Sequence, residues 1–436
     1  MEKVLIIANE FPPMGGAGVQ RTSKFVKYLP KFGFEPVVVT KEHVSDLTDE
    51  TLLDDLPDGL KIYNLKPYDM VNRKGLLRIP LKFIGTRILS PDAEYFWYYF
   101  NRKKVRDIIE KEKIKCIYTT SFPYSSHLMG LYLKELMPEL VWIADFRDEW
   151  TNNPYHLDSF FRRVKLKTER AKELSITNKC DFLIANTPFM LENFVKDTPS
   201  LGARSTYIPN GYDEEDFQGL LNQRNGGDKF VITYTGSLYG RRNLDEFLDG
   251  LKILLDNNKV DKNKLEIRIV GNVYQSVLDS YAQKYGLEGI IKSYGYLPHR
   301  ESIQMLFNSD ILLLVIGKGK GSRNFYTGKI FEYIRVDRPI LAIVPPDGAA
   351  AQVINETNTG KVVDPEDIKG VSEILEYYYN NWEENKKIHN PNWDEIKTYS
   401  RQSQAEKFAN IIKSQLEKDR LGRWILWNES GIGWIH

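Results

Sequence analysis

Residues 321–334 bring together groups that bind an anion and a group that binds hydroxyls. The segment reads Gly-Ser-Arg-Asn-Phe-Tyr-Thr-Gly-Lys-Ile-Phe-Glu-Tyr-Ile and stands between two apolar, strand-like runs. Thr327, Gly328 and Lys329, at a loop-to-helix junction, offer backbone N–H groups and one cation to an anion. Glu332 follows one helical turn later, on the same side of the helix. A cation for phosphate beside a carboxylate for hydroxyl groups suits a sugar nucleotide. The alternative is a strand-helix-strand crossover whose glycine only eases a turn.

A glycine-rich loop follows the first predicted strand, residues 4–8. Gly15, Gly16 and Gly18 let the backbone approach a ligand closely, and the helix expected from residue 19 directs its positive end to the same place. The spacing is not that of a dinucleotide-binding fingerprint. A flexible linker is the alternative, but at the carboxyl end of a strand we favour contact with a ligand.

The second half of the chain opens with a similar loop, in which Gly236 and Ser237 close a strand. A diphosphate in a cleft needs at least two cations to offset its charge, and arginine can bind it with bidentate geometry. Arg242, at the start of the next helix, is our candidate for one cation and Lys329 for the other. Arg241 is expected to be a surface charge.

Two polar residues stand near strand ends in the first half. Asp148 lies in the segment Asp-Phe-Arg-Asp-Glu-Trp and is a candidate for contact with acceptor or donor hydroxyls. The alternative is a salt-bridged turn formed with Asp145 and Arg147. His127, in the first turn of a predicted helix, is a candidate donor to a sugar oxygen, although a lone histidine is more often structural.

Three residues of the second half end predicted strands and could adjoin a nucleotide. Gly271 would leave room beside it. Tyr294 and Tyr296 offer backbone groups and a ring edge to a base.

Several common motifs are absent from the sequence. There is no phosphate-binding loop of the nucleotide-triphosphatase type, no His or Cys pair with metal-ligand spacing, no Asp-x-Asp after a strand and no G-x-S-x-G. We therefore expect no metal and no cofactor, so that protein cations and helix ends must meet the charge of a leaving diphosphate.

Short β-branched runs alternate with amphipathic ones, which predicts an α/β protein with parallel sheets covered on both faces. The alternation restarts after turn-forming residues at 207–213. We predict two Rossmann-like, doubly wound domains, 1–210 for the acceptor and 211–395 for the nucleotide sugar, facing a cleft. Residues 396–436 are expected to form a helix and tail that pack back on the first domain. The predicted strands are 4–8, 36–40, 61–65, 116–120, 141–144, 182–185, 230–234, 265–270, 290–294, 311–316, 340–344 and 360–363.

Composition is that of a soluble globular protein. The 436 residues include 42% hydrophobic and 27% charged residues, with a formal net charge of +1, which argues against a nucleic-acid partner. The two cysteines, Cys116 and Cys180, cannot form a disulfide framework and favour reduced core thiols in a cytoplasmic protein. No apolar run reaches the ~18 residues that span a bilayer.

Residues 72–106 are rich in lysine and arginine, with aromatic and aliphatic residues between them. Such a segment can hold a helix at the surface of an anionic membrane. We expect either a peripheral contact with the inner membrane surface here or an ordinary helical insertion with aromatics in the core.

Taken in order, these motifs resemble those of the retaining glycosyltransferases of the GT-B fold known as family four, glycosyl transferases group 1. The resemblance runs from about residue 4 to 413. It rests on the Gly15-Gly16 loop, Asp145-x-x-Asp148-x-Trp150, Pro209-Asn210-Gly211, Gly236-Ser237-Leu238 ahead of Arg242-Asn243, and Lys329-x-x-Glu332-Tyr333.

The resemblance implies transfer of a sugar, with retention, from a UDP- or GDP-sugar to a hydroxyl acceptor. It implies that Arg242 and Lys329 neutralise the diphosphate and that Glu332 contacts the ribose. The glycine loop near Gly16 would approach the donor.

The chain departs from the family pattern at two positions. The family has a second acid eight positions before Glu332, where this chain has Asn324, and often an arginine where it has Ser237. These features are closer to a subgroup found in bacterial surface-polysaccharide assembly, with a glycan or lipid-linked glycan as acceptor. Two alternatives remain, a sugar-nucleotide 2-epimerase of the same fold and a non-catalytic nucleotide-sugar-binding protein.

Overall fold

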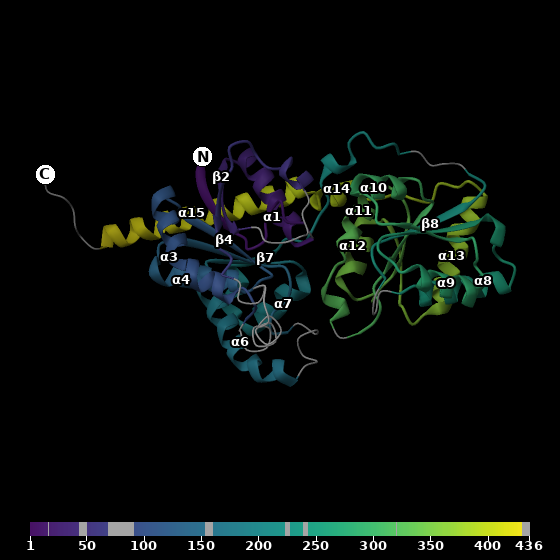
Figure 1. The fold of residues 1–436 in the computed structure, drawn as a ribbon, viewed down its shortest axis with the longest axis horizontal. Coiled ribbons are helices and arrows are strands. Elements are labelled where there is room, and N and C mark those ends of the chain that lie inside the picture. The colour runs from purple at the N-terminus through teal and green to yellow at the C-terminus, as the bar shows by residue number, and fades with distance from the viewer. Residues whose placement is uncertain are drawn as a thin grey trace, which may run out of the picture. The chain divides into compact units, whose positions relative to one another are not determined.

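The structure is a computed structural model that describes residues 1–15, 17–42, 50–68, 91–152, 160–222, 227–238, 243–319 and 321–429. The chain divides into two compact units. Unit 1 comprises Met1–Pro209 with Arg401–His436, and unit 2 comprises Asn210–Ser400 (Figure 1). The roles of acceptor and donor domain stay predictions.

Unit 1 is built on a parallel sheet that has, in the described residues, seven strands in the order β3-β2-β1-β4-β5-β6-β7. The strands are β1 Glu2–Ile7, β2 Phe34–Lys41, β3 Lys61–Leu65, β4 Cys116–Ser121, β5 Val141–Phe146, β6 Phe182–Ala185 and β7 Ser205–Tyr207. The helices are α1 Ala17–Tyr28, α3 Tyr95–Glu112, α4 Ser125–Leu136, α6 Phe160–Lys179, α7 Pro188–Asp197 and α15 Arg401–Glu429, with 3-10 turns η1 Leu29–Phe32, η2 Glu50–Leu53 and η3 Pro199–Ala203.

The strands of unit 1 bury both of their faces. In β1, Val4 and Ile6 pack in one hydrophobic cluster with α1 and α15, whereas Leu5 and Ile7 pack in another with α3, α4, α6 and α7. This is why the strand is apolar at every position rather than at alternate ones. Helix α15, drawn in yellow in Figure 1, therefore covers one face of a sheet that begins at the other end of the chain.

Unit 2 is built on a second parallel sheet, with six described strands in the order β10-β9-β8-β11-β12-β13. The strands are β8 Phe230–Thr235, β9 Leu265–Val270, β10 Ile291–Gly295, β11 Ile311–Val315, β12 Ile340–Ile343 and β13 Gly360–Val363. The helices are α8 Asp245–Asp256, α9 Gln275–Tyr285, α10 His299–Phe307, α11 Lys329–Arg335, α12 Ala349–Thr357, α13 Ile368–Glu383 and α14 Trp393–Thr398, with 3-10 turns η4 Glu214–Phe217, η5 Lys262–Lys264 and η6 Ser322–Asn324. Helices α8, α9 and α13 cover one face, and α10, α11, α12 and α14 the other.

The predicted parallel, doubly wound architecture is confirmed. Each predicted strand is present within a residue or two of its expected ends. Strand β7 was not predicted, because Ser205–Tyr207 is only three residues long. Both cysteines are free and buried, as expected.

Candidate functional site

Glycines form the carboxyl edge of three neighbouring strands in unit 2. Gly236 follows β8, Gly271 follows β9 and Gly295 ends β10, with φ angles of 109°, 148° and 64°. Their backbones are hydrogen-bonded in register, since Gly236 N donates to Val270 O and Gly271 N to Gly295 O, both at 2.7 Å. A Cβ atom on Gly271 would lie 2.6 Å from the carbonyl oxygen of Gly236. This glycine edge thus presents bare backbone at the place where ligands of parallel sheets bind.

Lys329 lies against the glycine edge. It is the first residue of α11, and its Nζ is buried 3.5 Å from the centroid of the Tyr234 ring. A Cβ atom on Gly236 would lie 3.2 Å from this Nζ. The ring face stabilises the ammonium where water is excluded. The structure therefore brings together Gly236, Gly271 and Lys329, three residues that the sequence predicted for one site.

Helix α11 is tied to β8 beside Lys329. The Tyr333 hydroxyl accepts a hydrogen bond from Thr235 N at 2.9 Å and lies 3.2 Å from Thr235 Oγ1. Burial raises the pKa of Tyr333 well above its usual value, so the hydroxyl stays protonated. Just before the helix, Thr327 is 3% exposed and its Oγ1 has no hydrogen-bond partner in the described part of the chain. Gly328 is the N-cap residue. A buried hydroxyl without a partner is unfavourable unless a ligand or water satisfies it.

Glu332 has a partner that the sequence did not reveal. Its Oε1 lies 2.8 Å from Nε2 of His299, the first residue of α10. The Nδ1 atom of His299 lies 3.9 Å from Oδ2 of Asp216, in η4. No periodicity or motif connects residues 33 positions apart, so only the folded chain shows this contact.

Three other predicted residues of unit 2 are next to glycines of this edge in the chain. Ser237 accepts a hydrogen bond from Tyr234 Oη through its carbonyl oxygen at 3.3 Å. Tyr294 and Tyr296 are 37% and 77% exposed, so their rings are available to a ligand. Arg242 lies outside the described residues, and its assignment stays a prediction.

In unit 1, Asp145 is part of a buried network. Arg21 Nε and NH2 donate to its two carboxylate oxygens at 2.7 and 2.9 Å, and Tyr118 Oη donates to Oδ2. Arg21 also donates to Pro209 O at 2.8 Å. Asp145 and Arg21 are both fully buried, so this bidentate pair ties β5 to α1. For Asp145 this favours a structural role, although its partner is Arg21 and not the neighbouring Arg147 of the expected salt-bridged turn.

Arg147 organises the carboxyl edge of the unit 1 sheet. Its guanidinium donates to the carbonyl oxygens of Gly18, Ser121 and Phe122. A Cβ atom on Gly18 would lie 2.7 Å from Arg147 NH1, so the absence of a side chain at this position leaves room for the guanidinium. Gly15 lies in the loop before α1, and Gly16 is outside the described residues.

His127 lies within the unit 1 core, whereas Asp148 is exposed. The His127 ring packs on Phe146, with centroids 4.1 Å apart, and its Nδ1 lies 2.8 Å from Thr119 Oγ1. Burial lowers the pKa of His127 to about 3, so the imidazole is neutral at pH 7. Its Nε2 is buried without a hydrogen-bond partner among the described residues.

Further buried polar atoms without hydrogen-bond partners occur at the same sheet edge. Besides His127 Nε2 they include, within the described residues, Asn9 Oδ1, Ser121 Oγ, Ser126 Oγ and Asn186 Oδ1. Asn9 follows β1 and Asn186 follows β6, whereas Ser121 and Ser126 flank the loop after β4. Polar atoms gathered in this way fit a hydroxyl-rich ligand that approaches the carboxyl ends of the strands.

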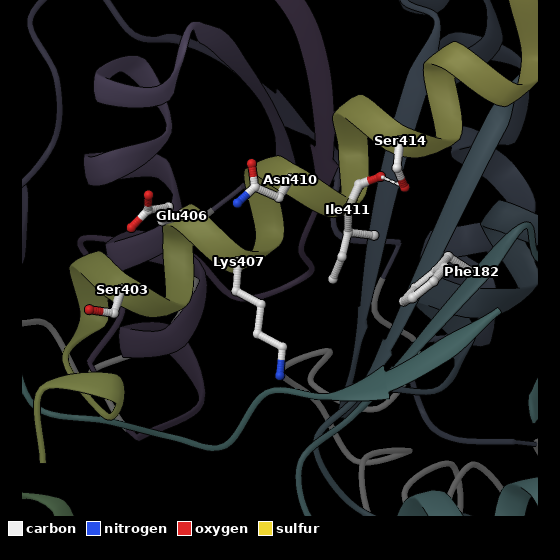
Figure 2. A pocket seen from close by; sticks show the side chains of 7 residues that line it. All are labelled: Phe182, Ser403, Glu406, Lys407, Asn410, Ile411 and Ser414. Atoms are coloured by element: carbon white, nitrogen blue, oxygen red, sulfur yellow. Dashed lines mark hydrogen bonds between the residues drawn. The ribbon is translucent and has the colours of Figure 1, made fainter. Parts of the chain in front are cut away.

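Two cavities lie away from these edges. One of about 450 Å³ runs along α15 beside Phe182 (Figure 2). Another of about 350 Å³ lies at the amino ends of β8, β11 and β12. Neither is lined by a predicted site residue. Since ligands of open parallel sheets bind at carboxyl ends, we place the site at the strand ends described above.

No group of His, Cys, Asp or Glu in the described residues could hold a metal ion.

Residues 15–216 match the family described as Glycosyltransferase Family 4, and residues 221–392 match Glycosyl transferases group 1. The chain is built from two glycosyltransferase-family domains. The two matches meet close to the boundary between unit 1 and unit 2.

A curated relative and several solved structures resemble this two-domain chain. The mannosylfructose-phosphate synthase of Agrobacterium fabrum is 22% identical over 227 residues, which span 47% of this chain and half the length of that relative. A glycosyltransferase structure from Rickettsia africae has a TM-score of 0.63 at 14% identity and covers 95% of this chain and 98% of its own. The lipopolysaccharide outer core galactosyltransferase WaaB has a TM-score of 0.59 at 14% identity, covering 95% and 100%.

The same fold occurs outside the glycosyltransferases. A putative UDP-N-acetylglucosamine 2-epimerase from Listeria monocytogenes has a TM-score of 0.54 at 14% identity, covering 95% of this chain and 97% of its own. At such identities the likeness concerns the fold alone, which is GT-B as predicted.

Proposed function

We propose that this chain transfers a sugar from a nucleoside-diphosphate sugar to a hydroxyl acceptor. The observation that carries the proposal is the position of Lys329, whose ammonium is buried against the glycine edge at the ends of β8 and β9. A cation in a dry site beside bare backbone suits a diphosphate, because charge that develops there is stabilised far more strongly than in water.

The site residues of unit 2 have separate roles in this proposal. Lys329 and Arg242 stabilise the departing diphosphate, and Glu332 receives ribose hydroxyls. Gly236, Gly271, Ser237, Thr327 and Gly328 contact the donor, and Tyr294 and Tyr296 adjoin the base. The anomeric carbon–oxygen bond to the diphosphate breaks and a bond to the acceptor oxygen forms. In the retaining mechanism that the resemblance implies, a phosphate oxygen of the donor takes the acceptor proton, so neither a protein base nor a metal ion is required.

The acceptor is proposed to bind to unit 1. The buried polar atoms at the ends of β1, β4 and β6 support this assignment, because sugar hydroxyls would satisfy them. His127 is proposed to donate to a sugar oxygen and Asp148 to contact acceptor or donor hydroxyls. As the resemblance implies, the loop of Gly15, Gly16 and Gly18 is proposed to approach the donor.

The resemblance to the polysaccharide subgroup supports a glycan or lipid-linked glycan as acceptor, in the cytoplasm at the inner membrane surface. On α3, Tyr99 and Phe100 are 41% and 50% exposed, and the Arg102 guanidinium lies over the Tyr99 ring. Exposed aromatics beside basic residues support a peripheral contact with anionic lipid. Much of segment 72–106 lies outside the described residues. No described helix is long and apolar enough to cross a membrane.

The proposal is tested with Lys329→Met, which keeps the length of the side chain and removes its charge. We expect UDP or GDP at saturating concentration to stabilise the wild type by about 3 kcal/mol and this variant much less. Turnover of the corresponding nucleotide sugars is expected to fall by about a hundredfold or more. Lys369→Met, at a side chain that is 86% exposed, is the matched control and should behave as wild type. Equal nucleotide binding and turnover in wild type and Lys329→Met would contradict the proposal.

A 2-epimerase is the second candidate, because the Listeria structure has the same fold. An epimerase consumes its nucleotide sugar without an acceptor, whereas a transferase releases nucleotide only as fast as acceptor is glycosylated, apart from slow hydrolysis. Following the nucleotide sugar by NMR with and without glycan acceptors separates the two. A protein that binds the nucleotide sugar and changes it in neither experiment would be the non-catalytic alternative.

A further inference from the structure

His299 lies between two carboxylates from different elements of unit 2. Its Nε2 lies 2.8 Å from Glu332 Oε1 on α11, and its Nδ1 lies 3.9 Å from Asp216 Oδ2 in η4. The three side chains are partly accessible, at 44% for His299, 26% for Glu332 and 28% for Asp216. This triad therefore stands at a surface that a ligand can reach, and not in the core.

The contact fixes one oxygen of Glu332. An ionised carboxylate only accepts hydrogen bonds, so the hydrogen between the two side chains is on Nε2 of His299. Oε1 is then held by the imidazole, whereas Oε2 makes no hydrogen bond to any described residue. A glutamate side chain has several rotatable bonds, and holding one oxygen limits the directions in which the other can point.

Glu332 lies close to Lys329 on α11, and this position relates its contact with His299 to the proposed donor site. Glu332 lies one helical turn from Lys329, whose Nζ marks the place proposed for the diphosphate. In a nucleoside diphosphate the ribose adjoins the diphosphate. An oriented Oε2 can accept a hydrogen bond from one ribose hydroxyl, whereas a freely rotating carboxylate would lose entropy on binding it.

We propose that His299 is a positioning residue that orients Glu332 for the ribose of the donor. The inference rests on the proposed function and adds a residue that no sequence motif indicated. Asp216 lies on the opposite side of the imidazole, with its Oδ2 atom 3.9 Å from Nδ1. His299 acts through Glu332, so its loss weakens recognition of the ribose hydroxyls and leaves the interaction of Lys329 with the diphosphate in place.

The experiment measures the affinities of UDP and GDP, and of their 2′,3′-dideoxy analogues, by calorimetry. We expect the wild type to bind the ribose form of its nucleotide about tenfold more tightly than the dideoxy form, and this ratio to fall close to one in Glu332→Gln and His299→Ala. His299→Gln places an amide nitrogen near the position of Nε2 and should restore most of the ratio. His299→Asn places its amide nitrogen nearer to Nδ1 and should not. Glu301→Gln, on the exposed side of the same helix, is the control for loss of a charge and should leave the ratio unchanged.

The outcomes separate this inference from the proposed function. If the wild type distinguishes ribose from dideoxyribose and Glu332→Gln does not, but His299→Ala still does, the positioning role is wrong while the donor site stands. If the wild type binds the nucleotide without distinguishing the sugars, the ribose role of Glu332 and the inference both fail, and the diphosphate site remains. If neither UDP nor GDP binds, the proposed function itself is overturned together with the inference.

Discussion

Single atoms decide how closely a ligand can approach the ends of β8 and β9. Gly236 and Gly271 lack the Cβ atoms that would otherwise fill the space beside Lys329 Nζ and the Gly236 carbonyl. The buried ammonium and the buried Thr327 hydroxyl add polar groups at this bare edge. An uncovered backbone and a desolvated cation together favour a compact anion over a bulky apolar ligand.

Replacing Gly271 with alanine tests whether this close approach is required. A Cβ atom there would lie 2.6 Å from a backbone oxygen, and φ is 148°, so the strands must separate. We expect Gly271→Ala to lower the free energy of unfolding by about 3 kcal/mol or more and to weaken nucleotide binding. Gly286→Ala is the matched control, because φ there is also positive, at 63°, but nothing lies within 4 Å of the added Cβ. Urea denaturation compares the two variants, and a Gly271→Ala protein as stable as Gly286→Ala would contradict the steric argument.

At the scale of elements, α11 carries both Lys329 and Glu332, so its attachment to the sheet controls the site. Although α11 has only seven residues, Ile330, Phe331, Tyr333 and Ile334 are fully buried. The Tyr333 hydroxyl adds a specific bond to Thr235 N at the end of β8. Packing holds the helix on the sheet, and this bond fixes its position along the strand.

Removing the Tyr333 hydroxyl should loosen that attachment. In Tyr333→Phe the buried Thr235 N–H loses its acceptor, which costs about 1–3 kcal/mol of stability and weakens nucleotide binding as α11 shifts. Tyr378→Phe is the matched control, since it also removes a buried hydroxyl, one that donates to Ile340 O at 3.2 Å from the other face of the sheet. Thermal unfolding with and without UDP or GDP measures both effects. If the two variants lose the same nucleotide response, the bond has no special role in the site.

The sequence reveals the local residue patterns of these elements but not the contacts between residues that are far apart in the chain. Continuous apolar runs such as Leu312–Leu314 identify strands covered on both faces, because burial imposes the composition locally. Short turns and close backbone approaches likewise leave glycines in the sequence, which led to Gly236 and Gly271. Pairings over long separations leave no such sign. Arg21 pairs with Asp145, which is 124 positions away in the chain. From the sequence alone, many other acidic residues are equally good candidates for the partner of this arginine.

At the scale of the whole molecule, unit 1 is made from both ends of the chain. The sheet is formed by residues before 210, but one of its faces is covered by α15, which begins at Arg401. Phe408 of α15 packs between Phe25 and Tyr118, with ring centroids 4.8 and 4.9 Å away. The first domain therefore completes its core only after the second has been synthesised.

Truncating Phe408 should weaken unit 1 selectively. The side chain is fully buried, so Phe408→Ala is expected to lower the stability of unit 1 by about 3–5 kcal/mol. Hydrogen exchange followed by mass spectrometry should show faster exchange in peptides from β1, β4 and β5 and unchanged exchange in peptides from β8, β9 and β11. Leu421→Ala is the matched control, on the same helix at a side chain that is 60% exposed, and should alter neither set. Equal acceleration in both sets would mean that the two units unfold as one cooperative body. Acceleration confined to unit 1 would mean that α15 stabilises unit 1 while the proposed donor site in unit 2 keeps its own stability.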